Sequence, residues 1–77
     1  MKRERLLLGA VRASQRPKKS QSQVARKAGM GLYRYWQIEN GDGRPPTKDE
    51  QAAVAAALGV SVNAIEWPEF IAKARAS

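Results

Sequence analysis

The chain has 77 residues, enough for one domain, and a domain of this size buries only about 60% of the surface that its unfolded chain exposes. It contains no cysteine and no histidine, which excludes a disulfide framework, a thiolate metal site and the commonest general base. The longest apolar run near the start is Leu6-Leu7-Leu8, far short of the about 20 residues that span a bilayer. We therefore expect a single domain over residues 1–77 that is soluble and intracellular, with no cofactor and no metal.

Charge is distributed unevenly along the chain. The whole sequence has a net charge of +7. Residues 1–34 hold ten basic residues and one acidic residue, whereas residues 35–77 hold four basic and six acidic residues. Such a one-sided excess of positive charge is typical of a protein that binds a polyanion with one face. An ordinary solvated surface is the alternative explanation.

Two helices are predicted in the N-terminal part. The first covers residues 4–15 and ends before Pro17, because the residue before a proline is disfavoured in the helical conformation. Its apolar stripe consists of Leu7, Leu8 and Val11. The second begins after Ser20, which fits a capping box with Gln23, and it ends at Gly29.

Further helices are predicted after the middle of the chain, and no strand is predicted anywhere. A capping box at 47–50 opens a helix over 48–58, which Gly59 ends. Shorter helices are expected over 62–66 and 68–76. With one more helix at the central motif described next, the sequence predicts a compact all-α bundle of five or six short helices.

The central motif covers residues 21–39. A connection of Gly29-Met30-Gly31 leaves no room for an antiparallel helix pair, so the two helices must cross steeply. Ala25 supplies the small residue that a close crossing needs, and the glycine that opens the turn tolerates positive φ. Tyr35 and Ile38 would fix the second helix to the core. These constraints are those of a helix-turn-helix unit.

Three sequence segments resemble the lambda-repressor-like and Cro-like family of DNA-binding domains. They are QSQVARKAGMG at 21–31, IENG at 38–41 and ALGVSV at 57–62. The resemblance implies a lambda-repressor-like fold in which the helix at 32–39 is the recognition helix and its N-terminal part enters the major groove.

The chain departs from that family at several positions. Tyr35 stands where valine or isoleucine is usual, and Trp36 stands where a small or polar residue is usual. We expect Trp36 to pack against the loop at 41–46; the alternative is that it stacks or touches the DNA backbone. Ser14 occupies the position at which the family often has an arginine, with Arg12 and Arg16 nearby, so that arginine's role is not assigned here.

The resemblance and the chemistry of the side chains together indicate candidate DNA contacts. The expected base-contacting residues are Leu32, Tyr33, Arg34 and Gln37. Glutamine pairs with adenine and arginine with guanine, each worth about 1–3 kcal/mol of discrimination, while apolar side chains can touch a thymine methyl. The expected backbone-contacting residues are Gln21, Lys18, Lys19, Asn40 and Arg44. The alternatives are ordinary ones: a solvated Arg34, local packing of Leu32 and Tyr33, and a helix-end cap by Asn40.

The two ends of the chain hold further candidates. A basic arm, flexible over residues 1–3, is expected to reach around the duplex with Lys2, Arg3 and Arg5. The alternative is a charged tail. In the C-terminal helix at 68–77, the expected dimer contacts are Phe70, Ile71 and Ala74. The alternative for Phe70 and Ile71 is closure of the monomer core.

Catalysis is not expected from this sequence. Its seven acidic residues include no pair at a metal-binding or acid–base spacing. Gly41-Asp42-Gly43 is not a phosphate-binding loop, because Pro45-Pro46 separates it from the next helix.

The expected function is therefore sequence-specific binding of double-stranded DNA by a small transcriptional regulator, a repressor of the phage-repressor or Cro type. The resemblance implies a cytoplasmic, nucleoid-associated protein of a prokaryote or phage, bound to an inverted-repeat operator as a weak homodimer or as a dimer formed on DNA. No small-molecule effector is expected, because the chain offers no second domain to bind one. Two alternatives stay open. One is a protein-interaction module such as the antitoxin of a toxin–antitoxin pair, and the other is packaging of nucleic acid without sequence preference.

Overall fold

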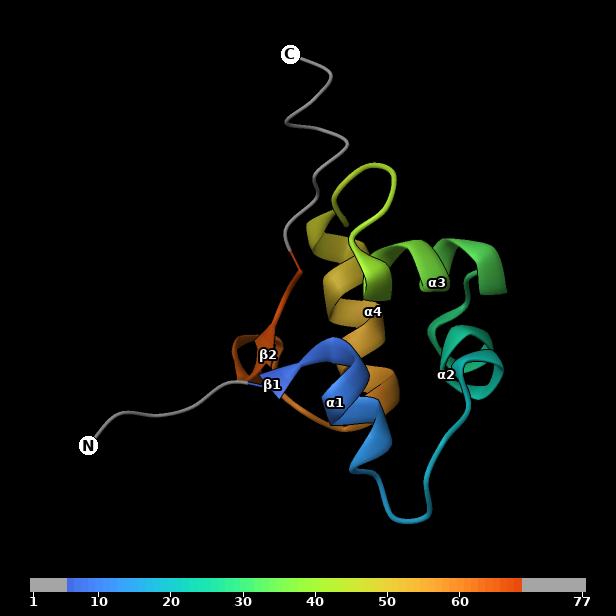
Figure 1. The fold of residues 1–77 in the computed structure, drawn as a ribbon, viewed down its shortest axis with the longest axis vertical. Helices are drawn as coiled ribbons and strands as arrows, with labels where there is room; N and C mark the ends of the chain where they lie inside the picture. Colours follow the sequence, from blue (N-terminus) through green and yellow to red (C-terminus); the bar gives the residue numbers. More distant parts are fainter. Residues whose placement is uncertain (1–5, 69–77) are drawn as a thin grey trace, which may run out of the picture.

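Four α-helices make up most of the structure. The computed structural model describes residues 6–68, in the order β1 (Leu6–Leu7), α1 (Leu8–Ala13), α2 (Gln21–Ala28), α3 (Leu32–Asn40), α4 (Lys48–Leu58), a 3-10 helix η1 (Val62–Ala64) and β2 (Ile65–Glu66). In Figure 1, α4 runs through the middle of the molecule, with α2 and α3 on one side and the two short strands on the other. No helix within the described range is long and apolar enough to cross a membrane.

Both predicted capping boxes are confirmed. At the start of α2, the Ser20 hydroxyl accepts a hydrogen bond from the Gln23 backbone N–H at 3.1 Å, and the Gln23 side chain accepts one from the Ser20 N–H at 2.7 Å. Thr47 and Glu50 repeat this exchange at the start of α4. Each box satisfies backbone N–H groups that the first turn of a helix leaves unpaired. Local sequence thus fixes where these two helices begin.

The first helix is shorter than the sequence predicts. A helix is expected over 4–15, whereas α1 covers Leu8–Ala13. Leu8 and Val11 are buried as expected, but Leu7, placed on the same apolar stripe, is exposed. The backbone at Leu7 is extended, with φ −61° and ψ 154°, so its side chain does not follow the helical stripe.

A small parallel sheet joins the two ends of the described chain, so the prediction of no strand is wrong there. β1 pairs with β2 in a register that places Leu6 opposite Ile65. The helix predicted over 62–66 is correspondingly reduced to the three residues of η1 before β2 begins. A strand of two residues is too short for an alternating pattern to be visible in sequence. The helix predicted over 68–76 lies outside the described residues, apart from Pro68.

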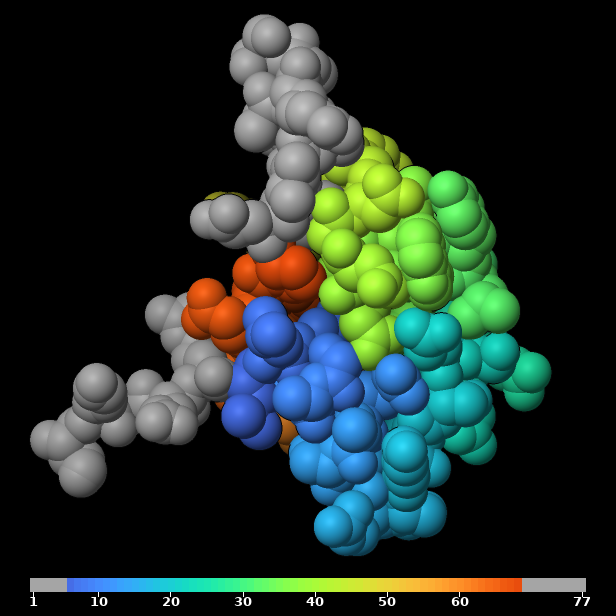
Figure 2. Space-filling view, in the orientation of Figure 1, coloured from blue at the N-terminus to red at the C-terminus, as the bar shows by residue number. Residues whose placement is uncertain are grey.

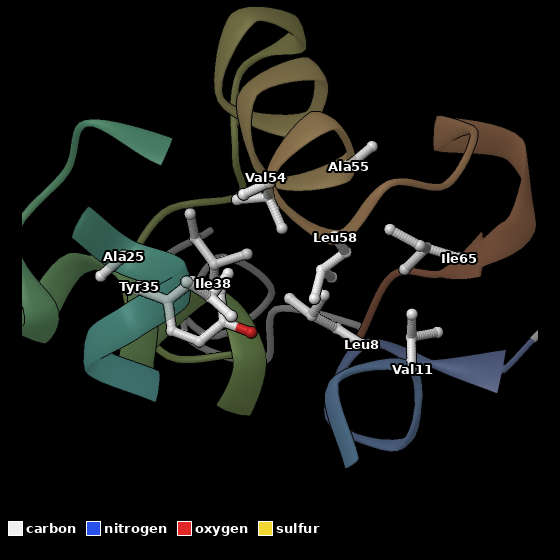
Figure 3. Close-up of a cluster of buried hydrophobic side chains, with 11 residues drawn as sticks. Leu8, Val11, Ala25, Tyr35, Ile38, Val54, Ala55, Leu58 and Ile65 are labelled. Carbon is white, nitrogen blue, oxygen red and sulfur yellow. The ribbon is translucent and has the colours of Figure 1, made fainter. Parts of the chain in front are cut away.

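Apolar side chains from all four helices and from β2 form the core (Figure 3). The buried residues are Leu8, Val11, Val24, Ala25, Tyr35, Ile38, Val54, Ala55, Ala57, Leu58 and Ile65. Tyr35 and Ile38, which the sequence predicts to face inward, are both fully buried. Their burial determines which face of α3 is turned to solvent.

Candidate nucleic-acid interface

The turn between α2 and α3 sets the geometry of the candidate interface. Gly29 ends α2 with φ 76°, a left-handed conformation that glycine adopts without steric cost. The Met30 N–H donates to the Ala25 carbonyl at 3.0 Å and closes the end of α2, and α3 begins soon afterwards at Leu32. The helix-turn-helix expected over 21–39 is therefore present. Figure 2 shows α2 and α3 adjacent at the edge of the molecule away from β2.

Three large apolar side chains are exposed on the outer face of α3. Leu32 is 49% exposed, Tyr33 66% and Trp36 39%. The rings of Tyr33 and Trp36 stack with their centroids 5.9 Å apart and an interplanar angle of 11°. We call Leu32, Tyr33 and Trp36 the aromatic ledge; together with Gln21 it lines a shallow hollow of about 370 Å³. The structure thus places Trp36 in a stack with Tyr33, while its expected packing against the loop at 41–46 stays a prediction.

A second hollow lies at the start of α2 and is basic. Its volume is about 450 Å³, and it is lined by Arg12, Lys18, Lys19, Ser20, Gln21 and Gln23. We call it the basic hollow. Three of the expected backbone-contacting residues, Lys18, Lys19 and Gln21, thus lie together. Because Gln21 also lines the hollow beside the aromatic ledge, the two surfaces meet at this residue.

Gln21 is held in place by an ion pair that the sequence analysis did not assign. Its Nε2 donates to Glu39 Oε1 at 2.7 Å. The other carboxylate oxygen, Glu39 Oε2, accepts from Arg12 Nε at 3.2 Å and lies 3.1 Å from Arg12 Nη2. The Arg12 side chain is 19% exposed and that of Glu39 only 9%. Arg12, two residues before Ser14, thus supplies the cation that pairs with Glu39.

One signal in the sequence points to this pair. Glu39 stands in the last turn of α3, where the negative end of the helix dipole disfavours an acidic side chain. An acid in such a place needs a cation from elsewhere in the fold. The pair also borders the core: burial and the charge of Glu39 raise the pKa of Tyr35 to about 12. The Tyr35 hydroxyl has no hydrogen-bond partner among the described residues.

Arg34 makes hydrogen bonds within the protein through all three of its guanidinium nitrogens. Its Nε donates to Glu50 Oε2 at 3.0 Å and its Nη2 to Glu50 Oε1 at 2.8 Å, a bidentate pair. Nη1 donates to the Arg44 carbonyl at 3.1 Å, and Nη2 also approaches the Pro45 carbonyl at 3.4 Å. The hydrogen bonds from Arg34 hold the pKa of Glu50 at about 2, well below its usual value, and the pKa of Arg34 is raised in turn. Arg34 ties α3 to the start of α4.

Three further candidates, Gln37, Asn40 and Arg44, lie in the second half of α3 and in the loop that follows it. The amide of Gln37 lies so close to Gly43 that a Cβ there would stand 2.6 Å from Gln37 Nε2. Asn40 Nδ2 donates to the Trp36 carbonyl at 3.0 Å, which corresponds to the helix-end alternative. Arg44 is exposed, with Nη1 3.7 Å from Glu50 Oε1. The candidates Lys2, Arg3, Arg5, Phe70, Ile71 and Ala74 lie outside the described residues.

Comparison with known proteins identifies the family. A model described as a helix-turn-helix domain matches residues 3–68, most of the chain. Neither the curated proteins nor the solved structures contain a significant match. The match covers both hollows and the turn between α2 and α3. The chain therefore belongs to the helix-turn-helix family of DNA-binding domains.

Proposed function

We propose that the chain binds double-stranded DNA sequence-specifically and acts as a small transcriptional regulator, a repressor of the lambda-repressor or Cro type. In this proposal α3 is the recognition helix and lies in the major groove. The start of α2 lies against the phosphate backbone beside it.

The observation that carries the proposal is the meeting of the basic hollow and the aromatic ledge at Gln21. A DNA duplex offers phosphates beside an open major groove, and a binder needs positive charge next to an element that fits the groove. Gln21 donates one amide N–H to Glu39, and its second amide N–H remains for a phosphate oxygen. Lys18 and Lys19 add positive charge on the same side.

The contacts of Arg34, Gln37 and Asn40 modify the proposed roles of these residues. Arg34 already has carboxylate and carbonyl partners, so we propose a structural role for it in place of a base contact. Gln37 lies against Gly43, and Asn40 bonds to the end of its own helix. We retain Leu32, Tyr33 and Gln37 as base-contacting candidates, and Gln21, Lys18, Lys19 and Arg44 as backbone-contacting candidates.

The experiment that tests the proposal is selection of bound sequences from a random duplex library, followed by affinity measurements at several salt concentrations. Enrichment of one sequence, bound at least about a thousandfold more tightly than random duplex, supports a specific regulator. An inverted repeat with half-sites about 10 base pairs apart would in addition support binding as a dimer.

Two results would contradict the proposal. Binding with no enriched sequence, and with an affinity that falls equally for all duplexes as salt rises, would indicate nucleic-acid packaging. Absence of measurable DNA binding, together with tight stoichiometric association with a protein encoded by a neighbouring gene, would indicate an interaction module such as an antitoxin. The exposed aromatic ledge is the feature that such a partner would use.

A further inference from the structure

We infer that the aromatic ledge recognises its DNA site through the C5-methyl groups of thymines, by apolar contact rather than by hydrogen bonds to base edges. The inference rests on the proposed function and specifies how α3 distinguishes one sequence from another. Leu32 and Trp36 lie four residues apart, and Tyr33 and Trp36 three apart, so the three side chains share one face of α3.

Two polar side chains of α3, those of Arg34 and Asn40, have hydrogen-bond partners inside the protein. Arg34 bonds to Glu50 and to two loop carbonyls, and Asn40 bonds to the Trp36 carbonyl. Gln37 is half-buried beside Gly43. The first turn of α3 instead exposes Leu32 and Tyr33, with Trp36 directly behind them. The exposed surface of this part of the helix is therefore mainly apolar.

The major groove offers one apolar group to such a surface. Guanine, cytosine and adenine present hydrogen-bond donors and acceptors there, whereas thymine presents a methyl group beside its O4 acceptor. The stacked rings of Tyr33 and Trp36 form a broad apolar surface, and each ring restricts the rotamers open to the other. Less side-chain freedom is therefore lost on contact than for flexible side chains.

The surroundings of the ledge favour DNA over a protein as its partner. Its hollow is lined by Gln21, Leu32, Tyr33 and Trp36, and no carboxylate is among them. Through Gln21 it continues into the basic hollow, which is lined by two lysines and an arginine. A surface in which apolar groups adjoin fixed positive charge complements a groove with methyl groups between rows of phosphates.

The test uses the full chain and the duplex obtained by selection. Each thymine is replaced singly by deoxyuridine, which removes the methyl group and leaves the base-pairing edge intact. We expect the affinity to fall about fourfold at each thymine that the ledge contacts, the value for burial of one methyl group. Replacing such a thymine–adenine pair by 5-methylcytosine–guanine should lose less affinity than replacing it by cytosine–guanine.

Variants of the protein connect the effect to the ledge. At one thymine of the site, replacement by deoxyuridine should weaken binding of the wild type but leave the affinity of Leu32→Ala nearly unchanged. The matched control is Lys27→Ala, an exposed residue at the other end of α2 that lines neither hollow, and it should keep the full difference. Circular dichroism establishes that both variants are folded; because Leu32 is exposed, its truncation leaves the core unchanged.

The outcomes separate the inference from the proposed function. Specific binding that is insensitive to deoxyuridine at every thymine would overturn the inference and leave the proposed function standing. An unchanged DNA affinity in Leu32→Ala would overturn it as well. Binding without any preferred sequence would overturn the proposed function, and the inference with it.

Discussion

Gly9 of α1 and Glu39 of α3 lie so close that a Cβ at position 9 would stand 2.6 Å from Glu39 Oε2. That oxygen is the one that accepts from Arg12, one turn further along α1. The absence of a side chain at Gly9 therefore leaves the space in which the carboxylate meets the guanidinium. The packing of α1 on α3 and the position of Gln21 depend on the same small contact.

Gly9→Ala should destabilise the protein although alanine is the better helix former. In an exposed helix interior this change stabilises by about 0.5–1 kcal/mol. Here the new methyl group displaces the Glu39 carboxylate from Arg12, and we expect the free energy of unfolding in urea to fall by about 1 kcal/mol. In the Glu39→Ala background the clash is gone, and Gly9→Ala should then be neutral or stabilising. A Gly9→Ala protein more stable than wild type would refute the steric argument.

Glu39→Ala should lower both stability and DNA affinity. It leaves the partly buried Arg12 guanidinium without its carboxylate and releases the Gln21 amide. We expect a loss of about 2 kcal/mol in the free energy of unfolding, because one partner of a hydrogen-bonded charge is removed. Asp42→Ala, which removes an exposed acid close to the same helix end, is the control for charge alone. Equal affinity for DNA in the two variants would show that Glu39 does not position Gln21.

Stability should fall in acid as Glu50 is protonated. Its pKa in the folded protein is about 2, against an ordinary 4.5, so the unfolded chain binds more protons between these values. The contribution of the carboxylate is therefore fully present above pH 4.5 and is lost as the pH falls toward 2. Because the Arg34–Glu50 pair is partly exposed, we expect the free energy of unfolding to fall by about 1 kcal/mol over this range at low salt. Thermal unfolding should be measured across this pH range for the wild type and for Glu50→Gln, which keeps a capping side chain. The variant should lose less stability on acidification than the wild type does. An identical loss of stability would show that Glu50 is not the group responsible.

Arg34→Lys should affect stability and leave base preference unchanged. Lysine keeps the charge but cannot make the bidentate contact with Glu50 or reach two carbonyls in the same geometry. We expect the free energy of unfolding to fall by about 1–2 kcal/mol. Selection from a random duplex library should return the wild-type sequence. A changed preference at a guanine would restore Arg34 as a base-contacting residue.

Lys18→Ala should weaken binding to all duplexes alike. A lysine in the basic hollow that neutralises one phosphate contributes about one unit to the slope of log affinity against log salt. The slope should therefore become shallower by about one unit, with the preferred sequence unchanged. Lys27→Ala, at the other end of the same helix, should leave the slope as it is. Equal slopes in the two variants would remove Lys18 from the interface.

Features fixed by neighbouring residues were predictable from the sequence. The capping boxes at Ser20 and Thr47, and the end of α2 at Gly29, follow from local hydrogen bonding and backbone freedom. The inward positions of Tyr35 and Ile38 follow from helical spacing and are confirmed by their complete burial. Together they were enough to place the helix-turn-helix.

Features that join distant parts of the chain were not predictable in this way. Arg12 and Glu39 are separated by 27 positions, and the residues next to each of them do not indicate which residue it pairs with. The strands that pair Leu6 with Ile65 have only two residues each, so neither shows the alternation of apolar and polar residues that would predict a strand. The guanidinium of Arg34 can bind a DNA base or a carboxylate within the protein equally well. Only the folded structure shows that Glu50 is close enough to bind it.

The two tryptophans give the protein a built-in optical reporter. Trp36 lies on the exposed stack with Tyr33, whereas Trp67 is half-buried with its indole N–H donating to the Val62 carbonyl at 3.3 Å. Iodide should therefore quench the fluorescence of Trp36 more readily than that of Trp67. In a Trp67→Phe protein the remaining emission comes from the ledge alone. If a duplex covers α3, iodide should quench this emission less, so the quenching measures DNA binding at α3 without an attached dye.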